Sequence, residues 1–461
     1  MTGPLPSAVK PVPDPAADFD AAVAHRGGAA LVLGVAGSGR TEVIARRFVG
    51  LVDDGVPGER IAVLAQGPAT RTRLRDRIET LLDRPFEELR VHTWEELAEK
   101  LLRDYALEAG LDPFFEVVGP ADRLAVMLDS LDELPLRRHE IRGNPAGLLA
   151  RLLERIDVLK AEGIGPAELR ERARAAERGA GGRAERESAL RELEFADLYE
   201  RHDAILLTRG AIDENELILE LGRLLSRRPD VSLAIGDRFR ELMVDELEDA
   251  GPARSALLPL IAPHEGVLVT CDPAQGLGSF RVWGEAAATR FRAAYPAAGE
   301  FTLDRPLRGD AGTPISPAAA ARACAALAPK PYAKVPEATP TAVIGRGEPE
   351  AELAEGGVME PALDVRLWRC SNERAQAQAV AREVEHLLAT GECQPEDICV
   401  VTGPAGREGR LVAAALEERN VAFRSSGSAA FFRRPEVRDV IAWLRALDDP
   451  CLLYTSDAAD E

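Results

Sequence analysis

The pattern of apolar and polar positions divides the chain into stretches of different kinds. Short apolar runs separated by amphipathic segments predict buried strands that alternate with helices, and the first such runs are residues 29–35, 61–65 and 89–93. Residues 111–235 keep helical spacing almost throughout, and residues 236–285 return to two further apolar runs. This order predicts an α/β core that is interrupted by a helical insertion.

The second half of the chain begins with a change in composition. Residues 310–363 are rich in Ala, Pro and Gly, which predicts a connection or a degenerate insertion. Beyond it, apolar runs alternate again with helical patterns and predict a second α/β unit, with strands at 364–370, 397–403 and 421–427. At the other end, the Pro- and Ala-rich residues 1–17 predict a disordered N-terminus.

The first apolar run leads into a glycine-rich loop. Ala29–Leu33 is followed by Gly34, Val35, Ala36, Gly37, Ser38, Gly39, Arg40 and Thr41, and a helical pattern begins directly afterwards. In this context, backbone N–H groups and the helix N-terminus bind a polyphosphate, and the Thr41 hydroxyl would bind Mg²⁺. Arg40 keeps a positive charge, but its guanidinium cannot replace the compact ammonium of lysine between two phosphates. The alternative is a glycine-rich turn without a ligand.

Two later apolar runs end in polar residues suited to nucleotide chemistry. ELMVDELEDA places Asp245 and Glu246 where one carboxylate would hold Mg²⁺ and the next would orient or deprotonate an attacking water. A solvated helix start is the plainer interpretation of this acidic pair. VLVTCDPAQGLGSFR continues from a strand to Gln275, Phe280 and Arg281. The spacing of the three segments is typical of an ATPase core.

Together these segments resemble the UvrD/Rep-like superfamily 1 DNA helicases. The matching stretches are VAHRGGAALVLGVAGSGRT, RVHTWEELAEKLL, AIDENELILELGRLL, LMVDELEDA, CDPAQGLGSFR, LDRPLRGD and GSAAFFRRPEVRDVIAWLRALDDP. The resemblance implies two RecA-like P-loop domains of α/β class, the second one truncated, with a helical insertion in the first. It also implies ATP and Mg²⁺ as cofactors, with hydrolysis driving 3′–5′ movement along single-stranded or tailed DNA in repair or recombination.

The resemblance assigns roles and boundaries. Asp245, Glu246, Gln275 and Arg308 would be catalytic, and Thr41 and Asp245 would hold the metal. Arg281 would contact DNA, and Phe280 would stack on a base or pack in the core. The implied parts are a first RecA-like domain (18–110 and 236–285), the insertion (111–235), a motif-containing connection (286–363) and a second RecA-like domain (364–450). The Arg-, Glu- and Gly-rich break at 170–188 would be a solvated loop or a DNA-facing arm.

Five positions depart from the family pattern. Arg40 replaces lysine, Glu248 replaces glutamine, Glu95 replaces histidine, and Asp18-Phe19-Asp20 lacks the adenine-reading glutamine. The segment that in the family carries a threonine and small residues against the DNA backbone reads Ala-Gln-Gly-Pro-Ala-Thr at residues 65–70. A carboxylate at Glu95 would repel phosphate. These departures predict a weakened or lost ATPase that an Arg40→Lys exchange would raise. Such subunits occur in heterodimeric helicase–nucleases of the AdnAB type, so a second subunit is a predicted partner.

Charge and cysteine usage narrow the class further. The formal net charge of −20 argues against a nonspecific polycation, but it leaves room for a local nucleic-acid groove. No apolar run has the length of a membrane helix, and the six scattered cysteines suit a reducing cytoplasm. Residues 451–461, CLLYTSDAADE, break the helical pattern and resemble a translated sequencing adapter. We therefore expect this tail to be an artefact on an N-terminal fragment.

Three functions remain open from the sequence. The first is a DNA-translocating ATPase, and the second is a structural or DNA-binding subunit that has lost hydrolysis. A generic P-loop NTPase is disfavoured because it gives no reason for the match at 364–450. Nucleotide binding and turnover would distinguish the first two.

Overall fold

The computed structural model describes residues 15–35, 37–82, 88–138, 145–264, 266–273, 283–303, 343–344, 365–366, 368, 370–391, 393–402, 407–424, 440 and 443. Two compact units divide the chain, Met1–Gly312 and Thr313–Glu461. The first unit contains a parallel sheet with helices on both faces, so the predicted α/β class is confirmed.

The central sheet of the first unit has six strands in the order β3-β2-β6-β7-β1-β8. The strands are β1 (Ala30–Gly34), β2 (Ile61–Ala65), β3 (Arg90–Thr93), β6 (Glu241–Val244), β7 (Val267–Cys271) and β8 (Gly299–Leu303). All neighbours are parallel, which brings the carboxyl ends of β1, β6 and β7 to one edge. Loops at this edge are where α/β proteins of this type bind ligands.

Alternate side chains of the central strands β1, β2, β6 and β7 enter two separate cores. Leu31 and Leu64 belong to one hydrophobic cluster, whereas Ala30, Val32 and Val63 belong to the other. This period of two is the geometry of a pleated strand buried on both faces. Continuous apolar runs such as Ala29–Leu33 were therefore sufficient to predict five of the six strands, but not β8.

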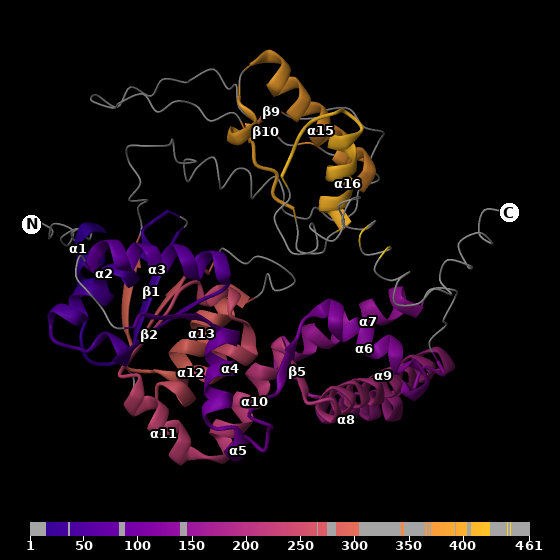
Figure 1. Cartoon of the computed structure of the whole chain (residues 1–461), viewed down its shortest axis with the longest axis horizontal. Helices are drawn as coiled ribbons and strands as arrows, with labels where there is room; N and C mark the ends of the chain where they lie inside the picture. Colours follow the sequence, from indigo (N-terminus) through magenta and orange to yellow (C-terminus); the bar gives the residue numbers. More distant parts are fainter. Residues whose placement is uncertain are drawn as a thin grey trace, which may run out of the picture. The chain divides into compact units, whose positions relative to one another are not determined.

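Helices cover both faces of the sheet (Figure 1). One face carries α1 (Pro15–Ala24), α2 (Arg40–Asp53) and α3 (Pro68–Leu82). The other face is covered chiefly by α4 (Trp94–Asp104), α10 (Glu214–Arg227), α11 (Pro229–Arg238), α12 (Gly251–Ile261) and α13 (Trp283–Ala294), with α5 (Ala106–Ala109) beside α4. Thr93 caps α4, and its side chain and that of Glu96 form reciprocal hydrogen bonds with the backbone of the first turn.

A helical region with its own core lies between β3 and β6 in the sequence. It contains α6 (Pro120–Asp129), α7 (Pro145–Glu162), α8 (Pro166–Gly179) and α9 (Arg183–Thr208), with a two-stranded parallel pair β4 (Glu116–Val118) and β5 (Ala211–Asp213). The predicted break at 170–188 is wrong in extent, since only residues 180–182 separate α8 from α9. Arg and Glu favour helix, and ion pairs such as Arg172–Glu168 link successive turns.

The first unit also includes strand β8, in the stretch that the sequence assigns to a connection. Each residue of β8 pairs in register with β1, from Ala30 with Gly299 to Gly34 with Leu303. At the N-terminus, α1 begins at Pro15, within the range predicted to be disordered, and residues 1–14 lie outside the described ones. Among the described residues, none of the helices combines the length and apolarity that crossing a membrane requires.

The second unit is described over a smaller part of its length. α15 (Glu373–Thr390) and α16 (Arg407–Glu417) pack through Ala377, Ala381 and Leu416, and β9 (Val343–Ile344) pairs antiparallel with β10 (Val365–Arg366). The predicted strand at 397–403 is wrong over its described residues, and residues 421–424 of the predicted strand at 421–427 are not in a strand either. Val401 is 86 % exposed, and no described strand pairs with these residues, whereas a strand needs paired neighbours to be stable in water. The tail 451–461 lies outside the described residues.

Candidate nucleotide site

The glycine-rich loop joins β1 to α2, as the sequence predicts. Gly37 and Gly39 have φ of 81° and 93°, a left-handed conformation that side chains disfavour. Gly34 is favoured for a different reason, because a Cβ there would lie 2.4 Å from Ser38 Oγ and would force that side chain to move. Of the predicted loop residues, Ala36 lies outside the described ones. The convergence of the loop's N–H groups on a phosphate stays a prediction.

Three oxygen-bearing side chains meet where β1, β6 and β7 end. Thr41 Oγ1 at the start of α2 donates to Asp245 Oδ2 at 2.8 Å, and Thr270 Oγ1 of β7 donates to Asp245 Oδ1 at 2.7 Å. Asp245 and Thr270 are fully buried, whereas Thr41 is exposed. Hydroxyl and carboxylate oxygens are the ligands that Mg²⁺ prefers, so this corner fits the metal that the sequence predicts. The signal for Thr270 was absent from the sequence, because its role depends on β7 lying beside β6.

Glu246 follows Asp245 in an unusual backbone conformation. Its φ of 56° and ψ of 53° are left-handed, which is uncommon for a residue with a side chain and points to a constrained site. Its N–H donates to Thr270 Oγ1 at 3.0 Å. Burial raises the pKa of the Glu246 carboxyl above its usual value, and the adjacent Asp245 adds to the effect. A carboxylate with a raised pKa is a better general base.

Gln66 holds the acidic segment in place from the neighbouring strand. Its side-chain Nε2 donates to the carbonyl oxygens of Asp245 at 3.0 Å and Glu246 at 2.9 Å. Sequence reasoning treated residues 65–70 only as a departure from a DNA-contacting segment, and it missed this contact. Gln66 directly follows β2, and β2 lies beside β6, which leads into the acidic pair. This contact could therefore have been predicted only once the order of the strands was known.

Arg40 is paired inside the protein. Its Nη1 lies 2.6 Å from Glu248 Oε1, and the two side chains are 8 % and 1 % exposed. Glu248 is in a short 3₁₀ helix, Leu247–Asp249, directly after the acidic pair. Burial raises the pKa of Glu248 to about 7, although the guanidinium of Arg40 opposes that shift. Two of the departures from the family pattern are thus in contact with each other.

Several predicted residues cannot be placed at the site. Gln275, Phe280, Arg281 and Arg308 all lie outside the described residues, so their roles stay predictions. Glu95 is described, and Arg254 of α12 forms an ion pair with it. This pairing offsets the repulsion of phosphate that a lone carboxylate would cause.

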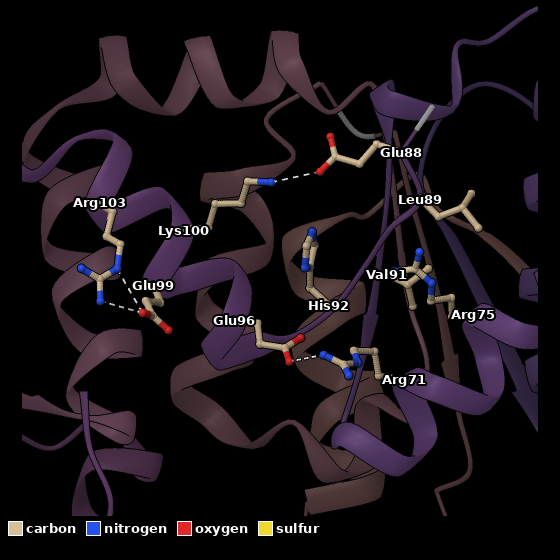
Figure 2. A pocket seen from close by; sticks show the side chains of 10 residues that line it. All are labelled: Arg71, Arg75, Glu88, Leu89, Val91, His92, Glu96, Glu99, Lys100 and Arg103. Carbon is tan, nitrogen blue, oxygen red and sulfur yellow. Dashed lines mark hydrogen bonds and ion pairs between the residues drawn. The ribbon is translucent and has the colours of Figure 1, made fainter. Parts of the chain in front are cut away.

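A polar hollow of about 570 Å³ lies beside edge strand β3, between α3 and α4 (Figure 2). Its charged side chains neutralise one another: Lys100 pairs with Glu88 at 3.2 Å, Arg103 with Glu99 at 2.8 Å, and Arg71 with Glu96. Burial lowers the pKa of His92 in this hollow. Because its cations already have counter-ions, we do not assign it a ligand.

The helical region contains a buried charge cluster that no sequence pattern predicts. Lys160 is fully buried, and its Nζ lies 2.8 Å from Asp203, 2.6 Å from Asp213 and 2.7 Å from Glu216. Asp203 also contacts the ring of His202 at 2.9 Å. His202, Asp203 and Asp213 could between them hold a metal ion, but the lysine ammonium already supplies the positive charge. We interpret this cluster as structural.

Comparisons with protein families match both units. Residues 17–291 match the UvrD/REP helicase N-terminal domain, and residues 354–451 match the UvrD-like helicase C-terminal domain. The first match covers more than half of the chain and includes all the described residues of the candidate site.

Individual relatives are distant but extensive. The chain is 23% identical over 432 residues to the ATP-dependent DNA helicase PcrA of Bacillus subtilis, which covers 93% of this chain and 52% of the relative. It is 25% identical over 444 residues to the ATP-dependent DNA helicase UvrD1 of Mycobacterium tuberculosis (93% and 52%). It is 23% identical over 421 residues to DNA helicase II of Escherichia coli (90% and 52%). The chain thus spans about half the length of the curated relatives it matches.

Proposed function

Because the chain belongs to the UvrD/REP helicase family, we propose that it binds ATP at the β1–α2 loop and couples hydrolysis to 3′–5′ movement along single-stranded DNA. The main support is that the side chains of Thr41 and Thr270 both donate hydrogen bonds to Asp245 beside a glycine-rich loop. The three residues lie at the carboxyl ends of neighbouring strands. The relatives' names as ATP-dependent DNA helicases support the same activity. We further propose that this activity serves DNA repair in the cytoplasm.

Each residue of the candidate nucleotide site has a separate role in the proposed hydrolysis. Thr41 and Asp245 would hold Mg²⁺, which supplies charge neutralisation on the β- and γ-phosphates when bound. Thr270 orients Asp245 and at the same time accepts a hydrogen bond from the Glu246 N–H. Glu246 would orient and deprotonate the attacking water, and the raised pKa of its carboxyl suits that role. Gln275 and Arg308 would complete the γ-phosphate contacts, and Phe280 and Arg281 would contact DNA.

The test is ATP turnover with and without single-stranded DNA. We expect stimulation by DNA in the full chain, and in a Glu246→Gln variant we expect ATP binding to persist while turnover falls by roughly 10²-fold or more. The matched control is Glu300→Gln on β8, which alters an exposed ion pair with Arg292 of α13 and should leave turnover unchanged. Absence of nucleotide binding in both proteins would contradict the proposal.

A second candidate is a DNA-binding or structural subunit of a heterodimeric helicase–nuclease that no longer hydrolyses ATP. The observation that favours it is the buried Arg40–Glu248 pair, since Arg40 stands where the family has its phosphate-binding lysine. In that case DNA binding would persist without ATP turnover, and a second helicase–nuclease subunit would supply the motor. The same turnover assay separates the two candidates.

A further inference from the structure

The cation of the phosphate loop already has an anionic partner from within the chain. Arg40 and Glu248 are 208 positions apart in the sequence, yet their side chains approach to 2.6 Å. Each residue is a departure from the family pattern, and the two departures are complementary in charge. Their contact suggests one linked change in the site rather than two independent losses.

The surroundings make Glu248 a strong competitor of a polyphosphate for the Arg40 guanidinium. Glu248 is 1 % exposed, so water does little to screen its charge. Asp272 and Asp245 also lie close enough to act electrostatically on the Arg40 guanidinium. An arriving triphosphate would therefore meet a guanidinium whose charge is already balanced, close to several carboxylates. Fewer favourable contacts remain for the γ-phosphate than in a loop with an unengaged cation.

We propose that Glu248 is a positioning residue that holds the Arg40 guanidinium away from the phosphate cradle and thereby lowers the affinity of this site for nucleoside triphosphates. This inference rests on the proposed function, because it specifies how the same ATP site is regulated. Nucleotide binding then requires the Arg40–Glu248 pair to open, and the free energy of opening is subtracted from the binding free energy.

The pair changes the expectation for a single lysine exchange. A lysine at position 40 keeps a positive charge beside a buried carboxylate, so Glu248 would hold it as it holds the guanidinium. Arg40→Lys alone is therefore expected to change nucleotide affinity less than roughly threefold. The gain from lysine appears only when Glu248→Gln is present as well.

The test is a double-mutant cycle on the full chain, with Arg40→Gln, Glu248→Gln and the combination of both. Binding of the Mg²⁺ complex of a fluorescent ATP analogue is measured by anisotropy at about pH 8, where the Glu248 carboxyl is ionised. We expect Glu248→Gln to tighten binding by roughly tenfold or more. In the Glu248→Gln chain, a further Arg40→Gln exchange should abolish that gain, because the released guanidinium is what makes the new contact with the phosphates.

A matched control is Glu241→Gln. Glu241 forms a similar pair at 3.0 Å with buried Arg47 of α2, but it lies at the opposite end of β6 from the acidic segment. This variant should bind nucleotide as the parent does. Thermal unfolding of each variant identifies any effect of lost stability, and Arg40→Lys/Glu248→Gln serves as the second variant if a glutamine at position 40 prevents folding.

The outcomes separate the two proposals. Equal affinity of the parent and Glu248→Gln chains would overturn the positioning role and leave the nucleotide site standing. Equal effects of Arg40→Gln in both backgrounds would also overturn it, because Glu248 would then act by simple repulsion. Failure of every chain to bind nucleotide, including Arg40→Lys/Glu248→Gln, would overturn both the positioning role and the proposed function.

Discussion

Replacing Lys160 with methionine should be among the most damaging single changes in the first unit. The side chain is fully buried and its Nζ contacts three carboxylates at 2.6–2.8 Å. At an effective dielectric of about 20, each contact is worth roughly 6 kcal/mol of gross attraction. Most of this is offset by desolvation, and the orphaned carboxylates can take up protons, so the net loss should be about 3–5 kcal/mol. Thermal unfolding should shift down by roughly 10 °C.

The pH dependence gives this prediction a signature. Burial alone would raise the pKa of the Asp213 carboxyl, but the ammonium of Lys160 brings this pKa below its usual value. A carboxylate with a lowered folded-state pKa adds stability above its unfolded pKa and loses that stability as the pH falls through its folded pKa. The gap in unfolding free energy between the parent and the Lys160→Met chain should therefore be widest near neutrality and should narrow below about pH 4.

Chemical denaturation at several pH values measures this gap. Arg170→Met is the control, since Arg170 also contacts two carboxylates, Asp197 and Glu200, but these are 57 % and 61 % exposed. The control should cost less than about 1 kcal/mol. A loss below about 1 kcal/mol in Lys160→Met, or a gap that does not change with pH, would refute the electrostatic account.

Two further predictions concern the nucleotide site. Thr270→Val removes the hydrogen bonds to Asp245 and Glu246, so the kcat of ATP hydrolysis should fall by roughly 10–100-fold in steady-state assays, and unchanged turnover would contradict this orienting role. ATP affinity of the parent should rise as the pH is lowered from about 8 to about 6, because burial raises the pKa of Glu248 to about 7 and the neutral carboxyl no longer holds Arg40. Among the described residues, Arg40 and Cys271 interact electrostatically with Glu248, the backbone of Asp272 hydrogen-bonds to it, and Glu248→Gln should abolish the rise.

The core strands and the loop were predictable because each depends on local pattern. Ala29–Leu33 is apolar and followed by glycines, and β1 covers Ala30–Gly34. The Arg40–Glu248 contact could not be predicted in the same way, since two distant substitutions meet only after the strand order is known. Thr270 and Gln66 were missed for the same reason.

In the second unit, the sequence pattern predicted a strand that the described residues do not form. Residues 397–403 have the composition of a strand, but Val400 and Val401 are exposed and the described residues there are not in a strand. A strand forms only with a neighbour to accept its hydrogen bonds, and sequence composition does not supply one. The helices α15 and α16 were predicted because their hydrogen bonds are internal.

The strand order also sets the sequence of events as the chain is synthesised. β1 pairs with β7 and β8, so its sheet partners are made only after the whole helical region has left the ribosome. The helices α6–α9 contact near neighbours and can fold early, because local contacts close short loops. β1 and its glycine loop must meanwhile wait as an unpaired apolar segment. The nucleotide site is therefore among the last parts of the first unit to assemble, and until then the newly made chain exposes an apolar segment that favours aggregation.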